Sequence, residues 1–394
     1  MEETKYLIIG NGIAGLSAAK EIRKRDKEGS IVMVTREPYL TYYRIKLTEY
    51  IGKDFQDDDL LVNGESWYKE NNIKILLSKI VENLDVDNNK IRLDDSREIG
   101  YEKLLLATGS RPFIPPIAGK YKQGVVALRT LDDLIYIKNY FSECENIVVV
   151  GGGILGLEAA WSLKTLGKEV SVIGRSSHLM PKQLDEEIGN KLEERLTEEG
   201  IKIYLSSTVD EILGKSQVNG LRLDNGIEIK TDSVLFSTGI IPSIDIVRNT
   251  PIEFNKGIIV DNNLKTNVDN VYAAGDSIEV NGKSIGLWTS SNEQGRIAGS
   301  NMAGKPMEYT GLKPFTTLRL GDIKIFSVGD IEKFDKVYEY RDEDKSIHHK
   351  LFTSDGKITG GILFGDIKDM GKLKNAVTEK VSIDSYLEDN LPFV

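Results

Sequence analysis

Two glycine-rich segments with the same spacing constrain what this chain of 394 residues can fold into. The pattern GxGxxG occupies residues 10–15, after the apolar run 6–9, and again residues 151–156, after the apolar run 147–150. In such a pattern the first glycine allows a tight strand-to-helix turn, the second lets a pyrophosphate approach the backbone, and the third lets the helix pack close to the strand. The two segments therefore predict two Rossmann-like units with a dinucleotide site at the start of each helix.

The chain repeats the surroundings of each glycine segment as well as the segment itself. An apolar helix pattern leads to a second strand at 31–34 in the first half and at 170–173 in the second, which completes a βαβ unit each time. Residues 104–112 and 234–242 both read as a buried strand followed by Thr-Gly-x-x-Pro, so we expect the chain to cross between domains near these two prolines. Two sites suit one flavin dinucleotide and one nicotinamide dinucleotide; the alternative, a Rossmann-like turn that binds nothing, stays open for either segment taken alone.

The character of the sequence changes after Pro314. Strand patterns at 323–328, 346–352 and 360–364 predict a separate antiparallel sheet, and a helix pattern around 372–378 closes it. The predicted fold class is α/β, with two Rossmann-like dinucleotide-binding domains and a C-terminal α+β domain that contains the antiparallel sheet.

Composition and charge exclude several classes of function. A formal net charge of −10 argues against a nucleic-acid partner, because phosphates favour a basic face. No apolar run approaches the roughly 18 residues of a membrane helix, and the start of the chain lacks a secretory pattern, so we expect a cytoplasmic protein without membrane contact. The single cysteine, Cys144, excludes an intramolecular disulfide and a CxxC pair, and no metal site is predicted.

Five motifs of this chain occur in the same order as in a known protein family. They are residues 10–15, 107–112, 128–133, 151–158 and 272–276, and together they resemble the pyridine nucleotide-disulfide oxidoreductase superfamily. Within it, the segment Tyr-Tyr-Arg-Ile-Lys-Leu-Thr-Glu from Tyr42, and the C-terminal strands, are similar to NAD(P)H:rubredoxin oxidoreductases and to the flavin domain of nitrite reductase large subunits. Those nitrite reductase subunits continue into iron–sulfur and sirohaem domains, so nitrite chemistry is not expected here.

The resemblance implies four domain segments and assigns a cofactor to two of the domains. An FAD-binding domain is split in sequence, an NAD(P)-binding domain is inserted in its middle, and a C-terminal domain covers the flavin. The implied boundaries are 1–112 and 242–312 for the FAD-binding domain, 113–241 for the NAD(P)-binding domain and 313–394 for the C-terminal interface domain.

The resemblance also assigns residues to the two cofactors. Arg44 and Lys46 would lie near the flavin and its phosphates, and Asp276 would accept hydrogen bonds from the ribityl chain, although a simple turn aspartate after glycine is the alternative. Trp288 would lie under the flavin, where it would gate the ring or mediate contact with the electron acceptor, or it would be part of the core. The complete set of predicted cofactor-binding residues is Gly10, Gly12, Ala14, Gly15, Glu37, Arg44, Lys46, Ala107, Thr108, Gly109, Arg129, Gly151, Gly153, Ile154, Leu155, Gly156, Glu158, Gly174, Arg175, Gly239, Gly275, Asp276, Trp288 and Gln294.

Two charged residues are the predicted catalytic groups. Glu158 resembles the family glutamate that lies near the nicotinamide and the flavin; the alternative is a solvated glutamate in the first turn of a helix. Relatives often pair this glutamate with a lysine where this chain has Glu49, and Lys46 is the substitute that we consider.

The residues that follow the second strand of each βαβ unit, after 31–34 and after 170–173, indicate which dinucleotide each unit binds. An acid at this place takes the adenine ribose hydroxyls, whereas an arginine suits a 2′-phosphate. Glu37 comes two residues later than usual and is the best candidate for the FAD ribose. Gly174-Arg175 offers a cation and no acid, which favours NADPH, although Arg175 pointing to water and dual nucleotide use remain alternatives.

The absence of cysteine from residues 42–47 decides where electrons can go. Disulfide reductases and their relatives need a thiolate beside the flavin, and this chain has none there. Electrons must therefore leave the flavin directly. We expect an FAD-dependent NAD(P)H oxidoreductase, monomeric, that reduces a small iron–sulfur protein, rubredoxin first and ferredoxin second. The alternatives are an NAD(P)H oxidase that uses oxygen and a nucleotide-sensing regulatory flavoprotein with little turnover.

Overall fold

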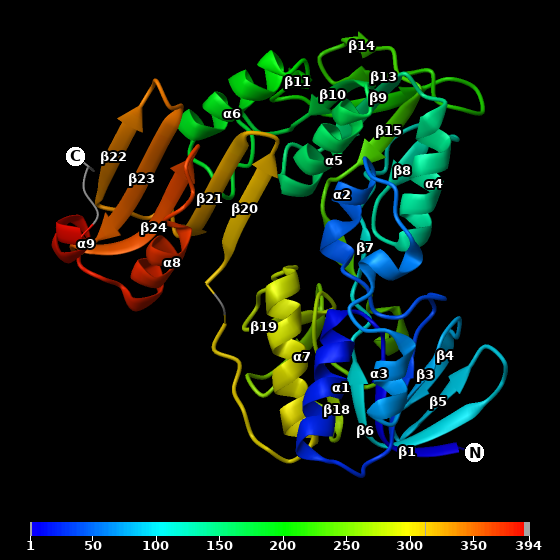
Figure 1. Cartoon of the computed structure of the whole chain (residues 1–394). Coiled ribbons are helices and arrows are strands. Elements are labelled where there is room, and N and C mark those ends of the chain that lie inside the picture. Colours follow the sequence, from blue (N-terminus) through cyan, green and yellow to red (C-terminus); the bar gives the residue numbers. More distant parts are fainter. Residues whose placement is uncertain (1, 312, 390–394) are drawn as a thin grey trace. The chain divides into compact units, whose positions relative to one another are not determined.

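The computed structural model describes residues 2–311 and 313–389, which form two compact units (Figure 1). The first unit contains residues 2–46, 54–112 and 239–311, and the second contains residues 47–53, 113–238 and 313–389. Each unit is thus assembled from segments that lie far apart in the sequence. The short segment 47–53, which the predicted boundaries place in the FAD-binding domain, belongs to the second unit, and residues 313–389 are grouped there with residues 113–238. The predicted domain boundaries stay a prediction.

A parallel sheet forms the centre of the first unit. Its strands follow the order β3-β2-β1-β6-β18, and all neighbours in this part of the sheet are parallel. The residues of β1, β2 and β6 that lead to the carboxyl edge, 6–9, 31–34 and 104–106, are all apolar and buried, because both faces of a parallel sheet are covered. The strands are β1 (Glu2–Ile9), β2 (Ile31–Val34), β3 (Ile73–Leu76), β6 (Glu98–Leu106) and β18 (Val271–Ala273).

The carboxyl ends of three strands meet at one edge of this sheet. Ile9 of β1 pairs with Val34 of β2 on one side and with Leu106 of β6 on the other. Helix α1 (Ile13–Arg25) begins immediately after this edge, and α7 (Trp288–Met302) lies beside it (Figure 1). In doubly wound folds ligands bind at the carboxyl edge of the strands, so this is where a nucleotide would be held.

Small residues bring α7 unusually close to α1. A Cβ atom on Gly295 would lie 2.1 Å from the carbonyl oxygen of Ala14, and one on Gly299 would lie 2.5 Å from that of Ala18. Any side chain at these two glycines would therefore collide with backbone, which cannot move aside as a flexible side chain can. The close contact fixes α7, and with it the segment that precedes α7, against the start of α1.

Shorter elements complete the first unit. β4 and β5 extend the sheet as an antiparallel pair along the first half of β6, and β7 pairs with β16 where the chain leaves and re-enters the unit. The bounds are β4 (Val81–Asp85), β5 (Lys90–Leu93), β7 (Ser110–Pro112), β16 (Ile240–Pro242), β17 (Ile258–Val260), β19 (Ile278–Val280), α3 (Glu65–Glu70) and the 3-10 turns Arg44–Lys46, Asp57–Leu60 and Asp245–Val247.

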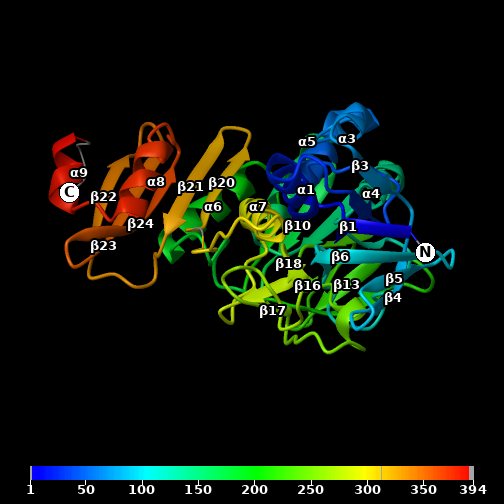
Figure 2. The same cartoon turned by 90° about the horizontal axis from the view of Figure 1, so that it is seen from below.

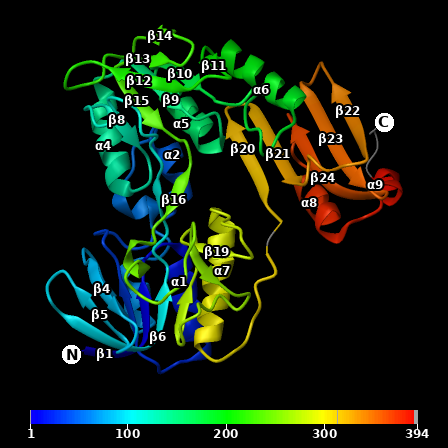
Figure 3. The ribbon, with the colours of Figure 1, turned by 180° about the vertical axis from the view of Figure 1, so that it is seen from behind.

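The second unit contains another parallel sheet, visible in Figure 3. Its five strands follow the order β11-β10-β9-β15-β8 and are all parallel, which repeats the design of the first unit. The bounds are β8 (Val125–Ala127), β9 (Asn146–Val150), β10 (Glu169–Ile173), β11 (Lys202–Tyr204), β15 (Ser233–Phe236), α2 (Leu47–Tyr50), α4 (Leu131–Ser142), α5 (Ile154–Thr165), α6 (Glu186–Glu198) and a small antiparallel sheet of β12 (Val209–Leu213), β13 (Gly220–Leu223) and β14 (Glu228–Ile229).

The crossing segment 47–53 lies in the second unit because it packs on α5. A Cβ atom on Gly52 would lie 3.1 Å from the carbonyl oxygen of Ser162 in α5, so only a glycine fits without displacement. The ammonium group of Lys138 in α4 donates to the carbonyl oxygens of Tyr50, Ile51 and Lys53. A loop of the first half of the sequence thus becomes part of the surface of the second Rossmann-like unit.

The last part of the chain is the predicted antiparallel sheet. The order is β20-β21-β24-β23-β22, and α8 lies against one face of it (Figure 2). Side chains from β21, β23, β24 and α8 form one hydrophobic cluster on that face. The bounds are β20 (Phe315–Leu320), β21 (Ile323–Gly329), β22 (Lys336–Asp342), β23 (Ile347–Ser354), β24 (Lys357–Phe364), α8 (Met370–Glu379) and α9 (Ile383–Asp389). The predicted fold class is confirmed.

Candidate dinucleotide-binding sites

The first glycine segment makes two backbone contacts that only glycine permits. Gly10 has a φ of +113°, and a Cβ atom there would lie 2.0 Å from the carbonyl oxygen of Ala107 at the end of β6. A Cβ atom on Gly15 would lie 2.1 Å from the carbonyl oxygen of Gly10. The turn from β1 into α1 is therefore pressed between the end of β6 and the helix itself, as the spacing predicts.

Gly12, between these two glycines, faces open space. A Cβ atom on Gly12 would have no heavy atom of the described residues within 4 Å. Gly12 is the N-cap of α1 and brings no side chain to its first N–H groups, and no acidic side chain lies in the described first turn of this helix. These N–H groups and the positive end of the helix dipole are free to meet an anion, so the residues present fit the pyrophosphate of FAD.

The second glycine segment reproduces this geometry. A Cβ atom on Gly151 would lie 2.3 Å from the carbonyl oxygen of Ser237, and one on Gly156 would lie 2.0 Å from that of Gly151. Gly153 is the N-cap of α5, and a Cβ atom there would again meet no described heavy atom within 4 Å. The second unit therefore offers an equivalent cradle at the start of α5, where Ile154 and Leu155 form the first turn.

Asp276 is held at the amino end of α7 by two hydroxyl groups. Ser110 Oγ donates to Asp276 Oδ2 over 3.0 Å, and Ser291 Oγ donates to Asp276 Oδ1 over 3.1 Å. The preceding N–H of Gly275 donates to Gln294 Oε1 over 2.9 Å. The structure thus brings the predicted residues Asp276, Gly275 and Gln294 together, and it adds Ser110 and Ser291, whose contacts no spacing pattern revealed. The role of these residues toward FAD stays a prediction.

Glu37 belongs to a second polar cluster after β2. Arg44 Nη2 donates to Glu37 Oε1 over 2.7 Å, and Tyr42 Oη donates to Glu37 Oε2 over 2.6 Å. The guanidinium group of Arg44 also lies 4.7 Å from the centre of the Tyr42 ring. Burial lowers the pKa of Arg44, but Tyr42, Glu37 and Asp276 outweigh it and raise that pKa. Arg44 therefore stays charged between the two carboxylates assigned to FAD.

Tyr43, which precedes Arg44 in the sequence, forms an aromatic pair with Trp288. The rings of Tyr43 and Trp288 stack with centroids 6.2 Å apart, and the ammonium group of Lys46 lies 4.8 Å from the Tyr43 ring centre. The indole Nε1 of Trp288 is buried and has no partner among the described residues. Lys46 and Trp288 are therefore both brought to Tyr43, a residue that the sequence analysis did not single out.

Glu158 lies in the second unit, on α5. Its Oε2 accepts a hydrogen bond from Thr48 Oγ1 over 2.8 Å, so the crossing segment 47–53 supplies its partner. Burial raises the pKa of the Glu158 carboxyl, the Thr48 hydroxyl lowers it and the charge of Glu49 raises it, with a net rise. Lys46 and Glu158 fall in different compact units, so their pairing stays a prediction.

The loop after β10 carries the residues expected to distinguish the nucleotides. A Cβ atom on Gly174 would lie 2.9 Å from Leu205 Cδ2, the far end of a flexible side chain. A Cβ atom on Gly152 of the second glycine segment would lie 3.8 Å from the Cα atom of Gly174, in van der Waals contact. Arg175 is exposed in this loop. The loop therefore lies beside the start of α5, where residues that contact the adenine ribose are expected.

The remaining predicted residues lie in turns and at strand ends. Thr108 Oγ1 donates to the carbonyl oxygen of Ser243 over 2.7 Å, and Gly109 and Gly239 have positive φ angles of 66° and 112°. Arg129 directly precedes Thr130, the N-cap of α4, and its N–H donates to Asp133 Oδ2. The roles assigned to these residues stay predictions.

Cys144 has the environment of a structural thiol. Its side chain is buried, and its Sγ donates to the carbonyl oxygen of Tyr140 over 3.4 Å. Burial, helped by Asp232, raises the pKa of the Cys144 thiol to about 11. At neutral pH the thiolate is therefore scarce, and thiolate is the form that redox chemistry needs.

The second unit contains a charged cluster between α6 and the antiparallel sheet, which no pattern in the sequence indicated. Glu187, Glu339 and His348 place one potential ligand atom each within 4.8 Å of one another. The ammonium group of Lys350 lies 2.5 Å from Glu187 Oε2 and 3.3 Å from Glu339 Oε1. Lys350 and the neighbouring Arg341 already neutralise these carboxylates, so the cluster acts as a network of ion pairs that joins the sheet to α6.

Two family models match the chain. The model described as pyridine nucleotide-disulphide oxidoreductase matches residues 4–295, and the model described as rubredoxin NAD+ reductase C-terminal domain matches residues 314–381. The first covers both glycine segments and the second covers the antiparallel sheet with α8. Among helices of the described ranges, none is long and apolar enough to cross a membrane.

Individual proteins agree with the family models. The chain is 35% identical to NADH-rubredoxin oxidoreductase of Clostridium acetobutylicum, over 98% of this chain and 97% of that protein. It is 34% identical to a nitrite reductase [NAD(P)H] of Bacillus subtilis over 97% of this chain but 48% of that protein, so it spans about half the length of this relative.

A solved structure gives the same result. The crystal structure of NADH:rubredoxin oxidoreductase from Clostridium acetobutylicum matches with a TM-score of 0.83 and 32% identity, over 99% of this chain and 100% of that one. The resemblance inferred from the motifs is therefore confirmed. The chain belongs to the pyridine nucleotide-disulphide oxidoreductase family of FAD-containing, NAD(P)H-dependent enzymes.

Proposed function

We propose that this protein is an NAD(P)H oxidoreductase that passes electrons through FAD to a small iron–sulfur protein, rubredoxin first and ferredoxin second. The observation that carries the proposal is the pair of open glycine cradles at Gly12 and Gly153, one in each compact unit. When bound, FAD supplies the step between a two-electron hydride donor and a one-electron acceptor. The chain itself holds the two dinucleotides and controls access to them.

The first unit holds FAD in this proposal. The helix α1 and Gly12 receive the pyrophosphate, Asp276 accepts from sugar hydroxyls and Glu37 accepts from the adenine ribose. Ser110, Ser291 and Arg44 keep the two carboxylates in place, because each donates to one of them. Tyr43 and Trp288 form the apolar wall near these groups.

The chain offers no thiol route by which electrons could leave the flavin. Cys144 is buried and its pKa of about 11 keeps it protonated, and residues 42–47 contain no cysteine. A disulfide relay therefore has no carrier in this chain, which supports direct transfer to an external acceptor. The match of residues 314–381 to the C-terminal domain of rubredoxin reductases supports rubredoxin as that acceptor. A monomer in the cytoplasm, without membrane or nucleic-acid partners, belongs to the same proposal.

NADPH is the nucleotide that the loop after β10 favours. Arg175 is exposed beside the start of α5, and no acid follows Ile173 at the place where NAD-specific sites carry one. The Clostridium relative is named for NADH, whereas the loop after β10 favours NADPH in this chain. The nucleotide preference of this chain therefore has to be measured.

The acceptor is tested directly with the purified, FAD-loaded protein. We expect NADPH oxidation with rubredoxin to exceed that with ferredoxin, oxygen or nitrite by at least about tenfold, a barrier difference of ~1.4 kcal/mol. Cys144→Ser is the matched control and should leave this activity unchanged. Fastest turnover with oxygen or nitrite, or a tenfold loss in the control variant without unfolding, would refute the proposal.

Arg175→Ala tests the nucleotide preference. A charge-assisted hydrogen bond to a phosphate is worth roughly 1.5–3 kcal/mol, so the variant should raise KM for NADPH about ten- to a hundredfold and leave KM for NADH nearly unchanged. Gly174→Glu should shift the preference toward NADH, since Leu205 can turn aside and the new acid repels the 2′-phosphate. An equal rise in KM for NADPH and for NADH in Arg175→Ala would contradict the proposed preference for NADPH.

The pH dependence of flavin reduction tests Glu158. An ionised carboxylate stabilises the positive charge that nicotinamide acquires as it gives up hydride, so the rate should rise as pH rises through the Glu158 pKa, which lies above the ordinary 4.5. Stopped-flow reduction by NADPH should show this rise in wild type. Thr48→Val removes the hydrogen bond that lowers the pKa and should move the midpoint to higher pH. Glu158→Gln should be about tenfold slower and flat; an unchanged profile in Glu158→Gln would exclude the role.

A further inference from the structure

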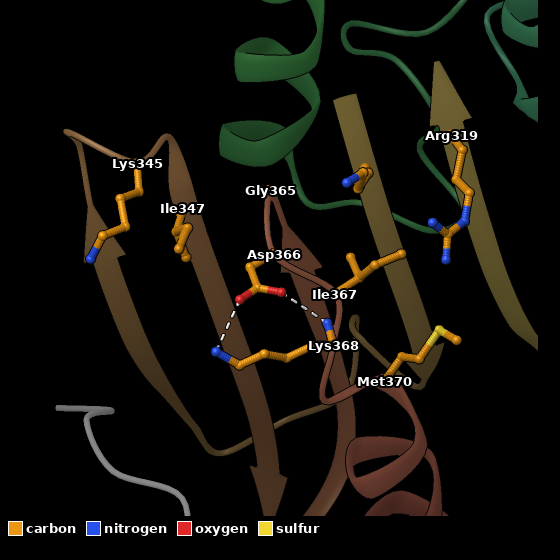
Figure 4. A pocket seen from close by; sticks show the side chains of 9 residues that line it. Arg319, Lys345, Ile347, Gly365, Asp366, Ile367, Lys368 and Met370 are labelled. Atoms are coloured by element: carbon orange, nitrogen blue, oxygen red, sulfur yellow. Dashed lines mark hydrogen bonds and ion pairs between the residues drawn. The ribbon is translucent and has the colours of Figure 1, made fainter. Parts of the chain in front are cut away.

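A pocket of about 540 Å³ opens in the C-terminal part of the chain, on the face of the antiparallel sheet that carries α8 (Figure 4). Phe326 and Val328 of β21 pack under α8, and alternate residues of a strand share a face, so Lys324 faces the same side. The lining residues are Arg319, Lys324, Lys345, Ile347, Gly365, Asp366, Ile367, Lys368 and Met370.

The pocket is basic in an acidic protein. Four of its nine lining residues are cations and one is an acid, whereas the whole chain has a formal net charge of −10. Two of the cations have local partners: Lys368 Nζ lies 3.1 Å from Asp366 Oδ2, drawn in Figure 4, and Lys345 Nζ lies 2.8 Å from Asp342 Oδ2. The single acid of the pocket is thus already engaged by its own neighbour.

The other two cations stand opposite each other without an anion. Arg319 of β20 and Lys324 of β21 are directly paired in the antiparallel register. No acidic side chain within the described ranges forms an ion pair with either of them. Like charges at directly opposite positions destabilise a strand pair, so an anion bound between Arg319 and Lys324 would relieve their repulsion.

Apolar and backbone groups complete the pocket. Helix α8 begins at Met370, so the positive end of its dipole adds to the cationic lining. Met370, Ile367 and Ile347 provide an apolar surface beside the charges. A planar guanidinium group matches the geometry of a phosphate oxygen pair, and an ammonium group adds a point charge to it.

We propose that this pocket binds a phosphate-bearing small molecule, with its phosphate between Arg319 and Lys324 and its apolar portion against Met370 and Ile367. The pocket has the size of small-molecule sites, which favours a free metabolite over a flat protein surface. All lining residues lie between residues 319 and 370, away from both glycine segments, so the proposal is independent of the proposed electron-transfer function.

Hydrogen–deuterium exchange of the FAD-loaded protein with inorganic pyrophosphate as the probe tests the proposal. Pyrophosphate should protect amides around residues 319–324 and 365–370, at an ionic strength held constant with sodium chloride. Arg319→Gln and Lys324→Gln should each weaken the affinity read from this protection about ten- to a hundredfold. Lys357→Gln removes the same charge from the same sheet outside the pocket and should keep the affinity of wild type.

A second measurement separates binding from damage to the sheet. Without pyrophosphate, Arg319→Gln should melt at the same temperature as wild type or higher, because the opposed like charges are relieved. With pyrophosphate, wild type should gain more stability than this variant, because the variant lacks the contribution of the pocket. Protection confined to the helix starts after the two glycine segments, or equal weakening in Lys357→Gln, would overturn the proposal whether or not the protein reduces rubredoxin.

Discussion

Backbone packed against backbone at two glycine turns is the constraint on which the rest of the structure depends. Gly10 is pressed against the carbonyl group of Ala107, and Gly151 against that of Ser237, each with the third glycine of its segment stacked behind it. These contacts leave no room for side chains, and overpacking such sites costs roughly 1–3 kcal/mol or more. Because the turns are fixed so tightly, the middle glycines can stay open, and the first N–H groups of α1 and α5 point to unfilled space.

The two halves use this shared design differently because different segments cover the two helices. In the first unit α7 touches the backbone of α1 through Gly295 and Gly299, which brings Asp276 with Ser291 to the cradle. In the second unit the crossing segment covers α5 and places Thr48 on Glu158. In the proposed function the first helix start holds FAD, and the second lies in the unit of Glu158, whose carboxyl pKa is raised by burial.

Much of the fold could be predicted because the sequence repeats its glycine segments and its Thr-Gly-x-x-Pro turns. The spacing of the glycines and the Thr-Gly-x-x-Pro turns identified both parallel sheets, and alternation identified the C-terminal strands, because these signals are local. Thr48, Ser110 and the Tyr43–Trp288 pair were not found, since their partners lie far along the chain and no spacing links them. The same reason hides the Lys350 cluster and the opposed cations Arg319 and Lys324, which arise only from strand register and helix packing.

A pair of substitutions tests the central claim, that two equivalent cradles hold two different dinucleotides. Gly12 and Gly153 have φ angles of −78° and −92° and free space around a Cβ atom, so valine should be tolerated by the fold while it fills the place of a pyrophosphate. The account predicts that Gly12→Val is folded but lacks FAD absorbance, and that Gly153→Val keeps one FAD per chain but is not reduced by NADPH. Full FAD content in Gly12→Val, or normal reduction of Gly153→Val, would contradict it.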